Sequence, residues 1–154
     1  MVHNNGPANI ADAQVIQAIQ HLNDAFSNSG GYTDPDGVDV GIEFCLAVQD
    51  EFGNFTTGIT NTTSPLTDMV AESDDLSLKG LISWDQESYL NIWVVNSITS
   101  SAMGSGVTGY AFFPSSHGQA EDGIVVEADY FGTTIDNSKT LIHEVGHYLG
   151  LYHT

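Results

Sequence analysis

The stretch HEVGHYLGLYHT, residues 143–154, places histidines at positions 143, 147 and 153 and a glutamate at position 144. His143 and His147 are four residues apart, so on an α-helix their imidazoles lie on one face about one turn apart. Two imidazoles placed in this way can share one zinc ion at about 2.0–2.1 Å each. Glu144 is then expected beside the ion rather than on it, which is the position of a general base.

His153 could not reach the same ion if the helix continued, because it would lie roughly 240° further round and about 9 Å further along the axis than His147. The helix must therefore end between them. Gly150 supplies the break, since glycine adopts the left-handed conformation that ends helices. The spacing predicts one zinc ion held by three neutral imidazoles, with a fourth position left for water. The alternative, a helix with histidines on its surface, requires five specified residues to coincide by chance.

The pattern H-E-x-x-H-x-x-G-x-x-H resembles that of the metzincin clan of zinc peptidases, and the run Leu149–Thr154 resembles its pappalysin family. Five further segments resemble the bacterial, ulilysin- or cytophagalysin-like members, so that the resemblance extends over nearly the whole chain; they are residues 42–47, 57–60, 78–80, 89–96 and 109–111. The resemblance implies an α+β, zincin-like fold: the N-terminal subdomain of a metzincin, with a mixed twisted β-sheet, a backing helix and a zinc-binding active-site helix. It also implies that zinc is the cofactor.

The chain departs from the family pattern at its ends. Metzincins carry a second subdomain after the third histidine, with a methionine-containing turn beneath the zinc. Here the sequence ends at Thr154, and Met69 and Met103 lie upstream of the motif. The family's first strand should begin before Val2. We therefore expect residues 1–154 to form a single domain that is part of a catalytic domain, and to be poorly active or inactive alone.

The favoured function is a secreted zinc metalloendopeptidase that acts on proteins or peptides, with His143, His147 and His153 as metal ligands and Glu144 as general base. A second hypothesis is a truncated remnant that binds zinc without cleaving peptides. A third is a calcium-dependent adhesion module built on the carboxylates of residues 34–39, because Ca²⁺ prefers several oxygen ligands in a loop. That segment lacks the full EF-hand pattern, so a solvated turn is its alternative reading.

Composition excludes some partners. The chain has 20 acidic residues against two basic ones, Lys79 and Lys139, for a net charge of −18. Such a polyanion repels phosphate backbones and anionic membrane surfaces, so we expect neither as a partner. No apolar run is long enough to span a bilayer, and no signal peptide is recognisable. Cys45 is the only cysteine, and we expect it in a strand, buried or half-buried.

Hydrophobic periodicity predicts the main elements. A helical period spans residues 9–28, and alternation of apolar residues indicates a strand over 40–48. An edge strand is predicted at 57–63, a central strand at 89–95 and the zinc helix at 138–150. Residues 64–80 and 97–108 are expected to be loops. Two further strands are predicted at 110–113 and 124–130.

The strand near residue 110 has a possible role in binding substrate. Its position in the chain resembles that of the metzincin edge strand along the upper rim of the cleft, which pairs with the substrate backbone. The resemblance therefore implies substrate contacts by Gly109, Tyr110, Ala111 and Phe112, through main-chain hydrogen bonds to an extended peptide. The alternative is that the aromatic residues here are simply part of the core.

Overall fold

Helix α3 (Ile135–Tyr148) lies against a three-stranded sheet in the computed structural model of the chain, which describes residues 1–153. The order of this sheet is β4 (Ile92–Val95), β8 (Ile124–Glu127) and β7 (Gly109–Ala111). The central strand β8 is parallel to β4 and antiparallel to β7. This mixture of directions, with helices packed on the strands, is the predicted α+β, zincin-like fold.

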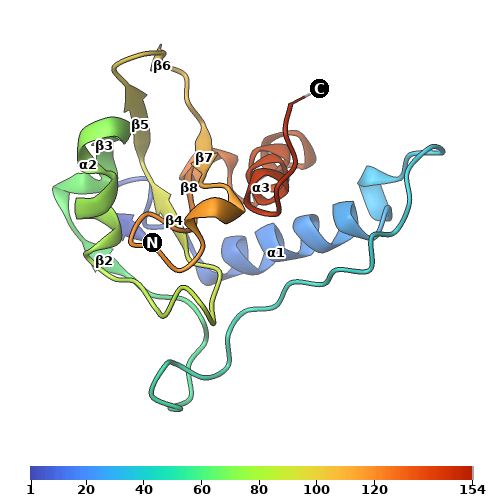
Figure 1. Cartoon of the computed structure of the whole chain (residues 1–154), viewed down its shortest axis with the longest axis horizontal. Helices are drawn as coiled ribbons and strands as arrows, with labels where there is room; N and C mark the ends of the chain where they lie inside the picture. The colour runs from blue at the N-terminus through green and yellow to red at the C-terminus, as the bar shows by residue number, and fades with distance from the viewer. Residues whose placement is uncertain (154) are drawn as a thin grey trace.

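Two smaller sheets complete the strand structure of the described residues. Strand β5 (Ser97–Ser100) lies between β3 (Asp68–Val70) and β6 (Gly104–Ser105), and β1 (Val2–His3) pairs in parallel with β2 (Thr62–Thr63). In Figure 1, β4, β8 and β7 lie between α2 (Ala71–Lys79) and α3, and α1 (Asp12–Phe26) runs along one side of them. Four single-turn 3₁₀ segments link these elements, at Gly30–Tyr32, Pro65–Thr67, Pro114–Ser116 and Ala128–Tyr130.

The core consists of two clusters on the two faces of the β4–β8–β7 sheet. Helix α1 buries Val15, Ala18 and Leu22 in the first cluster, where they meet Leu141 and Val145 of α3. The second cluster lies on the other face of the sheet. It is formed by Val2, Met69, Leu78, Trp93, Val95, Ile98 and Val125. The zinc-motif helix is therefore fixed by apolar burial along the face opposite its histidines.

The helices at 9–28 and 138–150 and the strands near 110 and 124 are confirmed within a few residues at their ends. The predicted strand over residues 40–48 is wrong. Its alternating apolar residues do not pair with another strand, and Val40, Ile42 and Val48 are exposed. The backbone of Phe44 is bonded instead by the side chain of Asn23 on α1, which donates at 2.9 Å and accepts at 2.7 Å.

Other expectations are corrected as well. Residues 64–80 contain β3 and α2, and residues 97–108 contain the β5–β6 hairpin, although loops were predicted in both places. Strand β4 lies at the edge of its sheet and not at the centre, because β8 takes the central position. Cys45 is exposed and lies outside any strand, since the 40–48 segment has no neighbouring strand to cover it.

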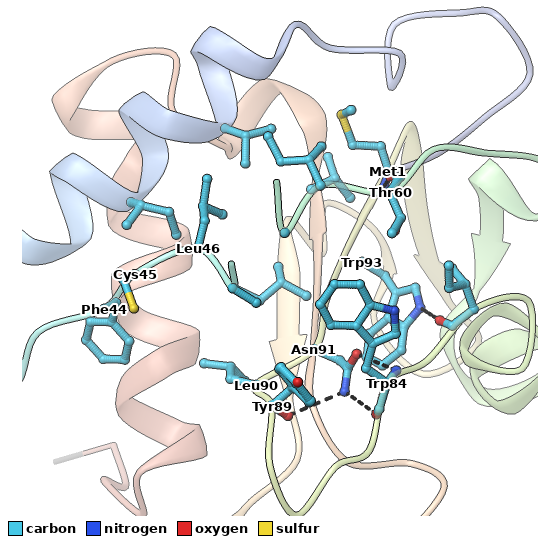
Figure 2. Close-up of a pocket in the computed structure, with 18 of the residues that line it drawn as sticks. Met1, Phe44, Cys45, Leu46, Thr60, Trp84, Tyr89, Leu90, Asn91 and Trp93 are labelled. Carbon is cyan, nitrogen blue, oxygen red and sulfur yellow. Dashed lines mark hydrogen bonds between the residues drawn. The ribbon is translucent and has the colours of Figure 1, made fainter. Parts of the chain in front are cut away.

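A cavity of about 400 Å³ separates the 44–47 segment from β4 and the residues before it. Figure 2 shows Phe44, Cys45 and Leu46 along one wall, and Leu90, Asn91 and Trp93 along another. None of the three histidines of the zinc motif lines this cavity. The chemistry predicted from the motif therefore belongs elsewhere, on α3. In residues 1–153 no helix has the length and apolar character needed to cross a membrane.

Candidate metal centre

Helix α3 presents His143 and His147 on one face, as the four-residue spacing predicts. The helix begins after Thr134, whose side chain accepts a hydrogen bond from the Asn137 N–H at 3.1 Å. This cap satisfies one of the free N–H groups of the first turn. His143 and His147 follow about 2.5 and 3.6 turns after this cap. Their imidazole rings lie with centroids 4.4 Å apart and Nε2 atoms 2.9 Å apart.

Beyond Tyr148 the chain reverses through a turn that returns His153 to the same face. Gly150 has a φ of +97°, and its N–H donates to the His147 carbonyl at 2.9 Å. The N–H of Leu151 donates to the Gly146 carbonyl at 2.9 Å. These two bonds around a left-handed residue form a Schellman motif, the common glycine-dependent end of a helix. The helix thus ends at the glycine, as predicted from the sequence.

The three histidine side chains converge on one point. Their Nε2 atoms form a triangle with sides of 2.9, 3.0 and 2.9 Å. The three contacts are not all hydrogen bonds, because a ring N–H donates along one direction only. The sides are close to the roughly 3.3 Å expected between ligands of a tetrahedral ion with bonds of about 2.0–2.1 Å. The donor set and its spacing therefore fit a zinc ion.

The surroundings of His147 fix its tautomer with Nε2 free to bind metal, and those of His143 favour the neutral ring. Nδ1 of His147 lies 2.7 Å from the Leu151 carbonyl, which can only accept, so Nδ1 carries the proton. Burial lowers the pKa of His143, and the neighbouring His147 and His153 lower it further. Neutral imidazole is the form that coordinates zinc. A carbonyl bonded to the other ring nitrogen is the usual partner of a metal-ligating histidine.

Aromatic contacts hold the turn that carries His153. The ring of Phe113 stacks on Tyr152 with centroids 4.6 Å apart and planes 18° apart. The same ring lies 5.3 Å from the imidazole of His147. From the sequence, Phe113 was expected only in the strand near residue 110, and its contact with Tyr152 was not predicted. The available signal was the position of Tyr152, an aromatic residue next to the third histidine.

Glu144 is buried beside the histidine cluster, with only 7% of its surface exposed. Burial raises the pKa of its carboxyl to about 6, against the smaller opposing effects of His147 and of the Ala111 N–H, which donates to it. Glu144 does not belong to the converging ligand set, which consists of the three histidines. A carboxylate at the edge of a metal site, with its pKa near neutrality, is suited to accept and return a proton.

Strand β7 provides an unpaired edge next to Glu144. The Phe112 N–H donates to Gly123 and the Glu127 N–H donates to Thr108, so residues 108, 110 and 112 bond to β8. Because ladder bonds alternate, the backbone groups of Gly109 and Ala111 point away from β8. A Cβ at Gly109 would lie 3.2 Å from Cγ of Glu144, so glycine allows β7 to lie this close to α3. A cavity of about 510 Å³ opens here, lined by Gly109, His143 and Glu144 among others.

The structure brings some predicted site residues together and keeps others apart. Gly109 and Ala111 face α3, whereas Tyr110 and Phe112 point to the opposite face of the strand. In the described part of the chain, the histidine triad is the one group of three or more metal-ligating side chains whose ligand atoms converge. The carboxylates in residues 34–39 do not form such a group. Asp34 and Asp39 instead accept the N–H of the second residue after each, at 2.8 and 2.7 Å.

Comparison with known proteins gives one family. The model of the peptidase family described as pregnancy-associated plasma protein-A matches residues 75–154, which is more than half of the chain. Mature mirolysin from Tannerella forsythia, solved in complex with a cleaved peptide, is 35% identical and superimposes with a TM-score of 0.82 over 99% of this chain. A structure of mirolysin with a small compound gives a TM-score of 0.76 at 34% identity.

Curated relatives carry the name extracellular metalloprotease. The one from Arthroderma benhamiae is 26% identical over 94% of this chain, and the one from Verticillium alfalfae is 31% identical over 54%. The chain spans 46% of the Arthroderma protein, 31% of the Verticillium protein and 62% of the mirolysin chain. It therefore corresponds to less than two thirds of each of these proteins.

Proposed function

The chain belongs to the pappalysin family of metzincin peptidases, and on that basis we propose that it is the zinc-binding part of a metalloendopeptidase catalytic domain. His143, His147 and His153 hold the ion, and Glu144 is the general base. The observation that carries the proposal is the triangle of three Nε2 atoms with sides of 2.9–3.0 Å, next to a buried carboxylate.

The residues around the ion have separate tasks. When bound, zinc would supply Lewis-acid chemistry, polarising a peptide carbonyl and lowering the pKa of a water molecule to about 7. Glu144 takes the proton of that water and passes it to the leaving amine. Its burial beside the histidines supports both steps, because a carboxyl held next to the reacting water can accept and return a proton there.

The substrate is proposed to be an extended segment of a protein or peptide. The outward N–H and C=O groups of Gly109 and the outward C=O of Ala111 can pair with its backbone, as in the addition of a strand to a sheet edge. The Ala111 N–H donates to Glu144 instead. Such pairing would align a peptide bond along Glu144 and the histidines, which lie beside the same edge. The family relatives named extracellular metalloproteases support secretion as the setting.

Casein hydrolysis tests the proposal in a zinc-loaded chain extended to the length of the relatives, compared with its Glu144→Gln variant. Residues 1–154 span only 46% of the Arthroderma protein and 62% of the mirolysin chain, and we expect them to cleave poorly alone. Glu144→Gln keeps the volume and removes the base, so we expect zinc content to stay at one ion per chain and hydrolysis to fall by at least about 100-fold. Hydrolysis at the wild-type rate in the variant would remove Glu144 from the mechanism. Zinc bound at full stoichiometry in an extended wild-type chain that does not cleave casein would favour the alternative of a zinc-binding, non-catalytic protein.

A further inference from the structure

Lys79 is a buried lysine in a chain with only two basic residues. It is the last residue of α2, and 1% of its surface is exposed. Its Nζ lies 2.9 Å from Oδ1 of Asp75 and donates to the Glu121 carbonyl at 2.5 Å. Removing an ammonium group from water costs free energy, and hydrogen bonds or ion pairs in its surroundings must offset that cost. The contacts of Lys79 therefore indicate its role in the structure.

Those contacts lead to strand β7. The Lys79 ammonium lies 4.3 Å from the ring centroid of Phe112 and 5.6 Å from that of Tyr110, within the range of cation–π attraction. The Tyr110 hydroxyl donates at 2.6 Å to Oδ1 of Asp75, the same oxygen that pairs with Lys79. Tyr110 of β7 and Phe112, the residue directly after the strand, thus both contact one ion pair on α2.

The opposite face of β7 meets the catalytic helix. A Cβ at Gly109 would lie 3.0 Å from the Thr140 side chain and 3.2 Å from that of Glu144. Residues alternate across a strand, so the anchoring residues Tyr110 and Phe112 interleave with Gly109 and Ala111, whose backbone groups form the free edge. The contacts that fix the positions of the Tyr110 and Phe112 side chains therefore also fix the position of the free edge relative to Glu144.

We propose that Lys79 is a positioning residue for peptide binding, which holds the free edge of β7 in register with the metal centre through Tyr110 and Phe112. The inference rests on the function proposed above. The Lys79 ammonium joins α2 to Glu121 and to the aromatic residues at β7, and it also lies 5.5 Å from the ring centroid of Trp93 on β4. An apolar side chain of the same length would fill the space without these directional contacts. Its partner Asp75 and the Tyr110 hydroxyl complete the support.

Two hydroxamates distinguish binding at the free edge of β7 from binding at the metal ion. Acetohydroxamate contacts only the zinc ion of the site, whereas a tripeptide hydroxamate also needs the backbone groups of the edge strand β7. In Lys79→Met, we expect the tripeptide hydroxamate to bind about tenfold more weakly or worse, since small displacements of a positioning element have effects of this size. Acetohydroxamate affinity and zinc stoichiometry should stay unchanged. Amide hydrogen exchange at residues 109–112 should become faster, while exchange in α3 should not.

Two further variants serve as controls for the effect of Lys79→Met. Ser77→Ala, on the exposed side of α2, should bind both hydroxamates as the wild type does. Tyr110→Phe removes one hydrogen bond and keeps the ring, so it should shift tripeptide binding in the same direction as Lys79→Met even if the lysine variant unfolds. Equal losses for the two hydroxamates, or no loss for the tripeptide in either variant, would overturn the positioning role. A wild-type chain that binds neither hydroxamate would overturn the proposed function itself.

Discussion

At the scale of single residues, the proposed metal centre depends on the backbone of Gly150 as much as on the three histidines. Its left-handed conformation, with φ at +97°, lets the chain turn so that His153 returns toward His143 and His147. A side chain at this position would meet only the ring of Pro114, at 3.5 Å, which is ordinary contact. The glycine is therefore required for its conformation and not for space.

Gly150→Ala should weaken zinc binding by about tenfold or more, because a non-glycine residue in the left-handed region costs about 1–2 kcal/mol and the turn can relax by moving His153. Competition with a coloured chelator measures the affinity. Gly53→Ala is a matched control, since Gly53 has a φ of +81° in an open turn with nothing within 4 Å. Both variants should lose similar stability, and an equal fall in zinc affinity would refute a specific role for Gly150.

At the scale of elements, the sequence predicted those whose signal is local. The zinc motif predicted the helix, the end of the helix at Gly150 and the convergence of the three histidines, because the position of each of these residues follows from helix geometry. Helix α2 was missed because its sequence is polar and a buried lysine interrupts the apolar period. The β5–β6 hairpin was missed because it is built of small residues. The alternation of apolar residues over 40–48 wrongly predicted a strand. A strand forms only where a neighbouring strand can pair with it, and the periodicity of one segment does not show whether such a neighbour exists.

Glu72 provides a second link between elements, this time from α2 to β5. Its carboxylate accepts the Ser100 hydroxyl at 2.6 Å and the Ser101 N–H at 3.0 Å. These bonds lower the pKa of Glu72 from 4.5 to about 2. The folded state therefore gains stability from ionised Glu72 above pH 4.5, and this gain disappears as the pH falls from 4.5 to about 2.

Urea unfolding across that pH range, in the wild type and in Glu72→Gln, measures the contribution. The wild type should be the more stable above pH 4.5, and the difference between the two proteins should shrink as the pH falls toward 2. The exposed position of Glu72 keeps the expected effect small. A difference that stays constant through the range would mean that the Glu72 carboxylate does not stabilise the contact between α2 and β5.

At the scale of the whole molecule, a net charge of −18 on 154 residues opposes the compact state. The repulsion between exposed carboxylates is screened by salt over roughly 8–10 Å at physiological ionic strength. We expect the Tm to rise with NaCl, at about 2–4 °C for each kcal/mol gained. Replacing two exposed carboxylates, as in a Glu43→Gln and Glu87→Gln double variant, should reduce the rise. A Tm that falls with salt would show that attractive ion pairs dominate instead.

X-ray absorption at the zinc edge is the sharpest test of the three-histidine site, because it reports the ligands of the ion in solution. We expect three imidazole nitrogens at about 2.0–2.1 Å in the zinc-loaded chain, together with one light-atom ligand from solvent. Loss of one imidazole in each of His143→Ala, His147→Ala and His153→Ala would assign the set. A zinc shell with fewer than three imidazoles, or one unchanged by all three substitutions, would contradict the metal centre proposed here.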